Sequence, residues 1–273
     1  MAHKLYLNKK KPNKKNTNVS VITCVLDGDK VLEKTIKNVL EQSYRNFEYI
    51  VVYTLSNDGT WEIIKKYSKK IDKIIINDEV GIYQAFNIGL KYANGKWINY
   101  MNAGDSFKSR NTLKDIFDNR NYDSDVLYSG SYVEYPNFKK YNPALPLNHL
   151  NRQMPFSHQS SFVKLNLHKK NKFNTFYNLS GDYDFFSKLE KKNYKFKKIN
   201  KTISVSMAFG VVDRRKVLTI YQNMLIANKY WNLKFLDKIF FYYSKIIYFS
   251  FTSLIRIFIP KKILLLILKL KYK

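Results

Sequence analysis

Acidic side chains stand directly after runs of apolar residues that are typical of buried strands. Asp27 follows the first run, Asp58 lies in a turn after the second, and Asp105 follows a later one. If these strands are parallel, their carboxyl ends meet at one edge of a sheet and the carboxylates lie close together. Such a cluster is costly to leave unpaired, which predicts a bound divalent cation or a satisfied hydrogen-bond network. Each single aspartate also suits a turn or a helix cap, and that alternative stays open.

Two further segments carry polar side chains that could line a pocket. Asp182 lies in the segment SGDYDFF at the predicted start of a helix, and His158 lies in the segment SHQSSF. A carboxylate at the edge of a pocket is a candidate general base. An aspartate at the start of a helix is also typical of capping, and a lone histidine is commonly structural. Asp184 follows two residues after Asp182, and only one of the two can easily face a pocket.

The elements that must position these side chains alternate between strands and helices. Apolar and β-branched runs predict strands buried on both faces, over Val19–Leu26, Phe47–Tyr53, Ile71–Ile76 and Trp97–Met101. Helical spacing predicts helices that end near Gln42 and that cover Thr60–Tyr67 and Tyr83–Tyr92. This alternation predicts an open α/β sheet whose ligands bind beyond the carboxyl ends of the strands.

The second part of this domain is less regular. Residues 122–210 predict a strand near Val126–Tyr135, a proline-bearing loop at 136–155 and a helix over Asp182–Lys191. We expect this part to complete the sheet and to cover the acceptor side of the pocket. The predicted catalytic domain therefore covers residues 19–212.

The order of the motifs resembles the nucleotide-sugar-binding half of family 2 glycosyltransferases with the GT-A fold. The matching segments are SVITCVLDGDKVLEKTIKNVLEQSYRNFEYIVV, SNDGTWEII and GIYQAFNIGLKYANGKWINYMNAGDSF. The resemblance is close over residues 19–107 and continues more weakly to about 210 through SHQSSF and GDYDFFSKL. It implies a Rossmann-like, mostly parallel sheet that is flanked by helices.

The resemblance also implies roles for particular residues. The nucleotide-sugar pocket would be lined by Thr23, Val25, Asp27, Tyr53, Asp58, Asn87, Asn102 and His158. Asp105 would hold Mn²⁺ or Mg²⁺ against the two phosphates, where a hard cation neutralises the charge of the leaving group. Asp182 matches the general base that takes the proton of the acceptor hydroxyl in an inverting transfer.

Two positions depart from the family pattern. Tyr53 stands where relatives commonly carry an aspartate that contacts uracil, and a tyrosine cannot accept a hydrogen bond from the ring NH as a carboxylate does. Asn102 leaves the metal-binding motif with one acidic residue, Asp105. These departures leave open a different nucleotide, a weaker donor affinity or a lost activity.

Charge is concentrated at the two ends of the chain. The sequence of 273 residues has a net charge of +27, and lysines crowd a basic N-terminal arm over residues 1–18. Such a charge favours polyanionic surfaces or phosphate-bearing substrates. The single cysteine, Cys24, lies in an apolar run, which excludes a disulfide framework and predicts a reducing compartment. No apolar stretch follows the first lysines, so we expect no secretory signal peptide.

The segment 213–273 predicts a basic, helical and amphipathic tail. Five polar residues recur at steps of four and seven, which places them on one stripe of a helix: Lys234, Lys238, Lys245, Thr252 and Arg256. The charge-free run Ile246–Ile255 is shorter than the ~20 residues of a spanning helix. We expect the tail to lie in the interface of an anionic leaflet. Packing on the catalytic domain or on another subunit is the alternative.

Together these features predict an inverting glycosyltransferase, peripheral on the cytoplasmic face of the cell membrane. It would move a hexosyl or N-acetylhexosaminyl group from a UDP-sugar to a glycan or lipid-linked acceptor in the biosynthesis of cell-surface polysaccharide or lipopolysaccharide. A catalytically impaired scaffold subunit is one alternative. A basic nucleic-acid-binding protein is another, but the sequence has no zinc-ligand spacing or aromatic RNA-binding signature, and we expect no nucleic acid partner. Whether the chain forms a homodimer stays open.

Overall fold

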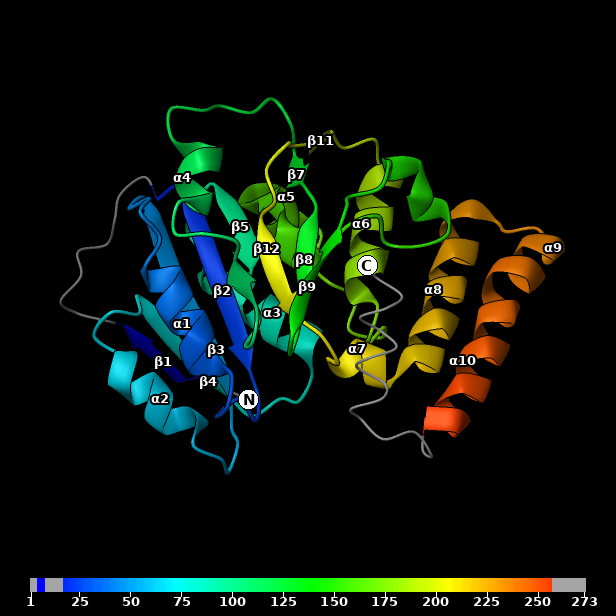
Figure 1. Cartoon of the computed structure of the whole chain (residues 1–273). Coiled ribbons are helices and arrows are strands. Elements are labelled where there is room, and N and C mark those ends of the chain that lie inside the picture. Colours follow the sequence, from blue (N-terminus) through cyan, green and yellow to red (C-terminus); the bar gives the residue numbers. More distant parts are fainter. Residues whose placement is uncertain (1–3, 8–16, 257–273) are drawn as a thin grey trace.

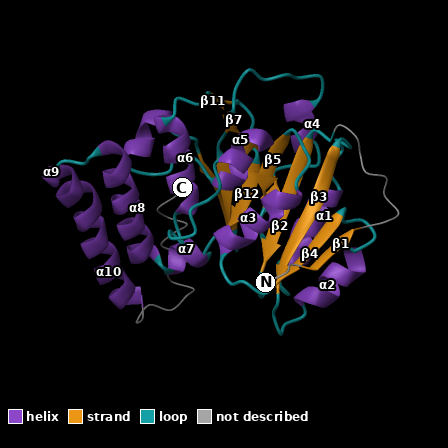
Figure 2. Ribbon diagram, turned by 180° about the vertical axis from the view of Figure 1, so that it is seen from behind, coloured by secondary structure: helices purple, strands orange, loops and turns teal. Residues whose placement is uncertain are grey.

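The computed structural model describes residues 4–7 and 17–256, and its centre is an eight-stranded sheet (Figures 1 and 2). Four neighbouring strands run parallel: β4 (Lys73–Asn77), β3 (Phe47–Thr54), β2 (Val19–Val25) and β5 (Trp97–Tyr100). Their side chains are almost all buried, as the continuous apolar runs predict. The predicted parallel sheet is therefore confirmed, with boundaries that differ by one or two residues.

Strands from both ends of the chain extend this parallel centre. β1 (Lys4–Leu7) pairs antiparallel with β4, so part of the predicted basic arm is an edge strand. On the other side, β10 (Ser161–Lys164) lies antiparallel between β5 and β7 (Val126–Tyr128), and β11 (Phe196–Lys198) closes that edge. The irregular second part of the domain thus completes the sheet.

The alternation of side chains along each strand divides the core in two. In β2, Ile22 and Cys24 face one apolar cluster, whereas Val21 and Val25 face the other. The first cluster is covered by α3 (Ile82–Tyr92), α5 (Leu165–Lys170) and α6 (Gly181–Lys191). The second is covered by α1 (Leu32–Leu40), α2 (Thr60–Tyr67) and α4 (Thr112–Phe117). Figures 1 and 2 show helices on both faces of the sheet, as expected for this fold class.

A second, four-stranded sheet lies beyond the carboxyl end of β5. Its order is β6 (Ser106–Phe107), β12 (Ser204–Met207), β8 (Ser131–Tyr135) and β9 (Phe138–Asn142). The single strand predicted near Val126–Tyr135 is therefore two strands in different sheets, because Ser129 and Gly130 separate β7 from β8. Two 3₁₀ turns, η1 (Leu147–Asn151) and η2 (His158–Ser160), follow this part of the chain.

The C-terminal helices pack on the domain that precedes them. After α7 (Val211–Arg214), helix α8 (Lys216–Trp231) packs against α6 and adds Ile220, Met224 and Ile226 to the first apolar cluster. α9 (Phe235–Asp237), a π-helical segment η3 (Lys238–Tyr243) and α10 (Ser244–Arg256) then run back beside α8 (Figure 1). The core thus continues across residue 212. Among the described residues, none of the helices has the length and apolar character needed to span a bilayer.

His168 is a buried histidine that should make stability depend on pH. Its ring stacks on Phe185 at 4.3 Å, Nε2 lies 3.3 Å from the Tyr100 hydroxyl, and burial lowers its pKa to about 4. Between about pH 6.5 and pH 4, the His168 imidazole is protonated in the unfolded chain but stays neutral in the native protein. We therefore expect a loss of about 3 kcal/mol in the free energy of unfolding across that window.

Urea unfolding of the wild type and of His168→Phe at pH 7 and pH 4 measures this contribution. The Phe variant keeps the ring contacts and should lose less stability on acidification than the wild type. Equal losses in the two proteins would contradict the assignment to His168.

Candidate active site

Asp182 lies in the first turn of α6 and is held by two side chains from other parts of the chain. Its Oδ1 accepts a hydrogen bond from the Tyr83 hydroxyl at 3.0 Å, and its Oδ2 lies 3.2 Å from His158 Nδ1. The carboxylate side chain is 18% exposed. Burial alone would raise its pKa, but the hydrogen bonds from His158 and Tyr83 hold the pKa of Asp182 below its ordinary value. The group is therefore an ionised, partly accessible carboxylate near neutral pH.

His158 connects this carboxylate to the loop after β5. An ionised Asp182 can only accept, so His158 donates to it through Nδ1. Asn102 Nδ2 lies 3.2 Å from His158 Nε2 and can donate to it when the imidazole is neutral. The Asn102 Oδ1 atom is buried, and no described side chain or backbone group donates to it. Three residues that are 24 to 80 positions apart thus form one hydrogen-bonded row, Asn102–His158–Asp182.

Tyr83 is a site residue that the sequence analysis did not single out. It lies on α3 inside the matching segment GIYQAFN, and it is 4% exposed. Its ring packs so closely on the start of α6 that a Cβ at Gly181 would lie 2.8 Å from it. Gly181 therefore allows Tyr83 to reach Asp182. The signal was available in the sequence, since Tyr83 and the expected site residue Asn87 stand one helical turn apart.

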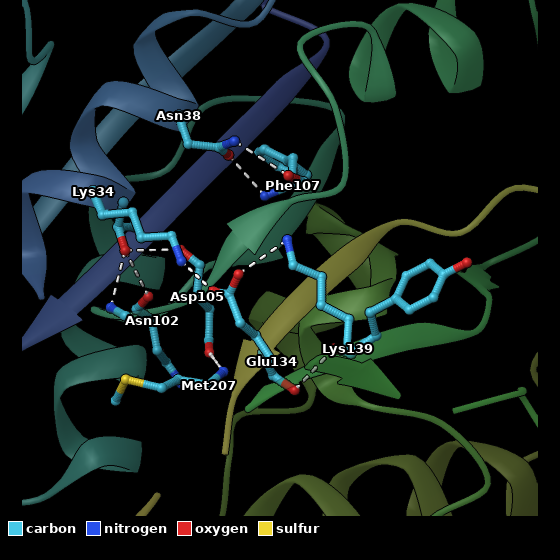
Figure 3. Close-up of polar contacts among 12 residues, drawn as sticks. Lys34, Asn38, Asn102, Asp105, Phe107, Glu134, Lys139 and Met207 are labelled. Atoms are coloured by element: carbon cyan, nitrogen blue, oxygen red, sulfur yellow. Dashed lines mark hydrogen bonds and ion pairs between the residues drawn. The ribbon is translucent and has the colours of Figure 1, made fainter. Parts of the chain in front are cut away.

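Asp105 is not part of this row. Its carboxylate bonds instead to the Gln159 side chain and to the backbone of Met207. Asp105 is 6% exposed, and its Oδ1 accepts from the Met207 backbone N–H at 3.0 Å (Figure 3). Its Oδ2 accepts from Gln159 Nε2 at 2.6 Å. Burial raises the pKa of the Asp105 carboxyl above its ordinary value, although these two donors act in the opposite direction. Gly104 has φ +94°, a conformation that favours glycine, and makes the turn possible.

The metal role expected for Asp105 stays a prediction, and this geometry does not favour it. Each Asp105 oxygen accepts one hydrogen bond inside the fold and the side chain is buried, so the remaining lone pairs are not presented to an open site. Within residues 4–7 and 17–256, no three His, Cys, Asp or Glu side chains gather as a metal site would require. The described side chains therefore do not form a cation site around Asp105.

Asp27 and Asp58 lie at the same carboxyl edge of the sheet but differ in their availability. Asp58 accepts hydrogen bonds from Ser56 Oγ at 2.8 Å, from the Thr60 N–H at 3.1 Å and from the Asp29 N–H at 3.0 Å. Burial would raise its pKa, yet these bonds hold the pKa of Asp58 well below its ordinary value. Asp27 is exposed, adopts a left-handed φ of 51° and has no side-chain partner among the described residues. Asp27 is thus free to meet a ligand, whereas Asp58 fixes the turn.

Four other expected pocket residues are committed to the interior. Thr23 donates to the Met101 carbonyl, Val25 is 4% exposed in the core, and Asn87 makes two hydrogen bonds to the Phe173 backbone. Tyr53 is 3% exposed, stacks on Trp61 with ring centroids 5.5 Å apart and bonds its hydroxyl to Ser56. In this conformation Thr23, Val25 and Tyr53 are buried, whereas Asn87 is half-buried. Asp184, the second acid of GDYDFF, faces away from Asp182 and pairs with Lys229 at 2.9 Å.

Comparison with known proteins fits this arrangement. Residues 20–199 match the family described as Glycosyl transferase family 2, which is about two thirds of the chain. The chain belongs to this family. The match ends at Ile199, directly after β11, so this family 2 chain carries its C-terminal helices beyond the matched residues.

Two curated relatives illustrate the similarity of this family 2 chain. It is 27% identical over 172 residues to a PGL/p-HBAD biosynthesis glycosyltransferase of Mycobacterium bovis. The aligned residues cover 61% of this chain and 67% of the relative. This chain is 31% identical over 121 residues to the cholesterol galactosyltransferase of Borreliella burgdorferi, covering 43% and 33% of the two chains.

Solved structures support the fold. TarS of S. aureus superposes with a TM-score of 0.61 at 19% identity, over 81% of this chain and 41% of that chain, so this protein spans less than half of TarS. A TarS fragment, residues 1–349, is known in complex with UDP-GlcNAc, with a TM-score of 0.60, 18% identity and coverage of 81% and 69%. The mannosyltransferase PcManGT of Pyrobaculum calidifontis, solved with GDP-Man and Mn²⁺, has a TM-score of 0.57 at 18% identity and coverage of 80% and 69%. At these identities the likeness establishes the GT-A fold.

Proposed function

We propose that this family 2 chain is an active, inverting glycosyltransferase with Asp182 as its general base. The observation that carries this proposal is the row Asn102–His158–Asp182, which ends in an ionised and partly exposed carboxylate. Inversion needs one base on the side of the anomeric carbon opposite the leaving group, and one such carboxylate is present here. The intact geometry favours this proposal over a catalytically impaired scaffold.

The chemical step transfers a proton and a glycosyl group in one displacement. The acceptor hydroxyl oxygen forms a bond to the anomeric carbon, while the bond from that carbon to the phosphate oxygen breaks and the nucleoside diphosphate leaves with the electron pair. The hydroxyl proton passes to Asp182. Tyr83 and His158 hold the carboxylate in place, so it meets the acceptor without reorganisation.

Asp27 is a described polar group that remains open to a donor. The unpaired Asn102 Oδ1 is buried, so its side chain would have to turn toward the pocket before a sugar hydroxyl could donate to it. Asp27, exposed after β2, can accept from a base NH or a ribose hydroxyl. We infer that Asp27 takes the base-recognition role that Tyr53 does not fill.

The relatives support one donor class and one acceptor class for this proposal. We propose a UDP-linked hexose or N-acetylhexosamine as donor, because a TarS structure holds UDP-GlcNAc in the same fold. We propose a glycan or lipid-linked hydroxyl as acceptor, in the biosynthesis of a cell-surface glycan. The Borreliella relative supports this class because its name specifies cholesterol as acceptor.

Thermal unfolding with a panel of UDP-, GDP- and CMP-sugars, with and without Mn²⁺, tests donor binding. A donor at one hundred times its Kd stabilises the native state by about 2.7 kcal/mol, which raises Tm by about 5 to 10 °C for a domain of this size. We expect such a shift with at least one UDP-sugar, and the Asp182→Asn variant should keep it because the base contacts the acceptor. No shift with any donor would contradict the enzymatic proposal.

A further inference from the structure

The outer face of the C-terminal helical hairpin is apolar. Five side chains on α9, η3 and α10 recur at steps of three or four residues and therefore lie on one face of the helix. They are 43% to 74% exposed and form what we call the apolar ridge: Leu236, Phe240, Tyr243, Ile247 and Phe251. Figure 1 shows α10 at the end of the molecule, with α8 between it and the catalytic domain. The ridge lies on the helix that is farthest from the main sheet.

The polar stripe predicted for this tail does not form its outer edge. Lys238 and Lys245 are only half-exposed, and Lys245 Nζ lies 3.5 Å from the centroid of the Phe241 ring. Burial and the nearby Lys216 lower the pKa of Lys245. On the same helices, Phe241, Ile246 and Phe249 pack toward the core. The helix therefore keeps its lysines along its flank and presents aromatic and aliphatic side chains outward.

The chain around the apolar ridge is strongly basic. Between residues 214 and 252 the sequence has seven Lys or Arg residues and one acid, Asp237, which pairs with Arg152 at 3.5 Å. The exposed bases of this region include Arg214, Arg215 and Lys234. A contiguous exposed apolar face marks an interaction site, and its cationic surroundings select an anionic partner.

We propose that the apolar ridge binds the surface of an anionic lipid bilayer. The aromatic and aliphatic side chains enter the boundary between headgroups and acyl chains, and the flanking lysines and arginines meet the acidic headgroups. A second copy of the same chain is disfavoured as the occupant, because it would place one +27 protein against another along two basic flanks. The proposal concerns a surface apart from the active site and can fail without affecting the proposed transfer reaction.

Flotation of the full chain with vesicles measures this binding without donor or acceptor. We expect binding to vesicles of 30% phosphatidylglycerol in phosphatidylcholine, weaker binding to pure phosphatidylcholine, and a further loss when NaCl is raised from 0.1 to 0.5 M. The triple variant Phe240→Ser, Ile247→Ser, Phe251→Ser should bind at least about tenfold more weakly. Phe176→Ser is the control, since Phe176 is also strongly exposed, at 77%, but is not part of the apolar ridge.

A second variant tests directly whether the apolar ridge enters the bilayer, and its signal does not depend on a loss of binding. Trp introduced by Phe240→Trp should shift its emission to shorter wavelength when anionic vesicles are added, whereas Phe176→Trp should not. Unchanged flotation of the triple variant, or no shift at position 240, would overturn the proposal. So would a dimer that forms without lipid and dissociates in the triple variant, because the ridge would then bind a second copy.

Discussion

Replacement of Asp182 by Asn is expected to lower kcat by about 10²- to 10⁴-fold, the usual contribution of a positioned general base. The amide is nearly isosteric and can still bond to Tyr83, so the fold and the donor affinity should remain. Without the carboxylate, the acceptor proton has no base as the new bond forms. Transfer rates with the donor selected by thermal unfolding, measured at saturating acceptor, check the effect.

Asp184→Asn provides the matched control for this experiment. Asp184 stands two residues later in the same helix, but it is 4% exposed and bonds to Lys229 and Tyr230 on the other side. Its replacement should leave kcat within about twofold of the wild type and lower only the stability, by about 1 to 3 kcal/mol for a weakened buried hydrogen bond. If the Asp184 variant lost transfer and the Asp182 variant retained it, the assigned base would be wrong.

The four parallel strands at the centre of the sheet can be predicted from the sequence, because their burial is visible in short local segments. A strand covered on both faces must be apolar throughout, and the runs around Ile22 and Ile50 have that character without reference to any distant residue. The small second sheet lacks this signal. β8 and β9 are partly or fully exposed. They pair with each other locally, but β8 joins the rest of this sheet through β12, some 70 residues later.

The order of the sequence motifs predicted which residues could share a pocket, but not how each side chain is bonded. Asp182, His158 and Asn102 lie together in the structure, and the roles assigned to them stay predictions. For Thr23, Tyr53 and Asn87, residue type and position could not reveal which internal partner already bonds to a polar atom of each side chain. The same limit applies to the tail, where periodicity identified an amphipathic helix. Only packing against α8 decided which face points outward.

Asp105→Ala is expected to lower the free energy of unfolding by about 2 to 6 kcal/mol, because two donors would each lose an acceptor at about 1 to 3 kcal/mol. Those donors are the Met207 N–H in β12 and the Gln159 amide beside His158. Asp105→Asn should cost less, since its amide oxygen still accepts from Met207 and it carries no charge into a buried site. Urea unfolding followed by circular dichroism measures both losses.

Two further measurements distinguish a structural role of Asp105 from a metal-binding role: the stability of an Asp78→Ala control and the effect of Mn²⁺ on donor binding. Asp78 also follows a strand of the parallel centre but is exposed, so Asp78→Ala should change stability by less than about 0.5 kcal/mol. Because both Asp105 oxygens already hold the fold together, Asp105→Asn should leave any effect of Mn²⁺ on donor binding unchanged. A variant of full stability that lost a Mn²⁺ effect present in the wild type would show that Asp105 leaves Gln159 and Met207 to bind the cation. The loop after β5 would then have to rearrange when the donor enters.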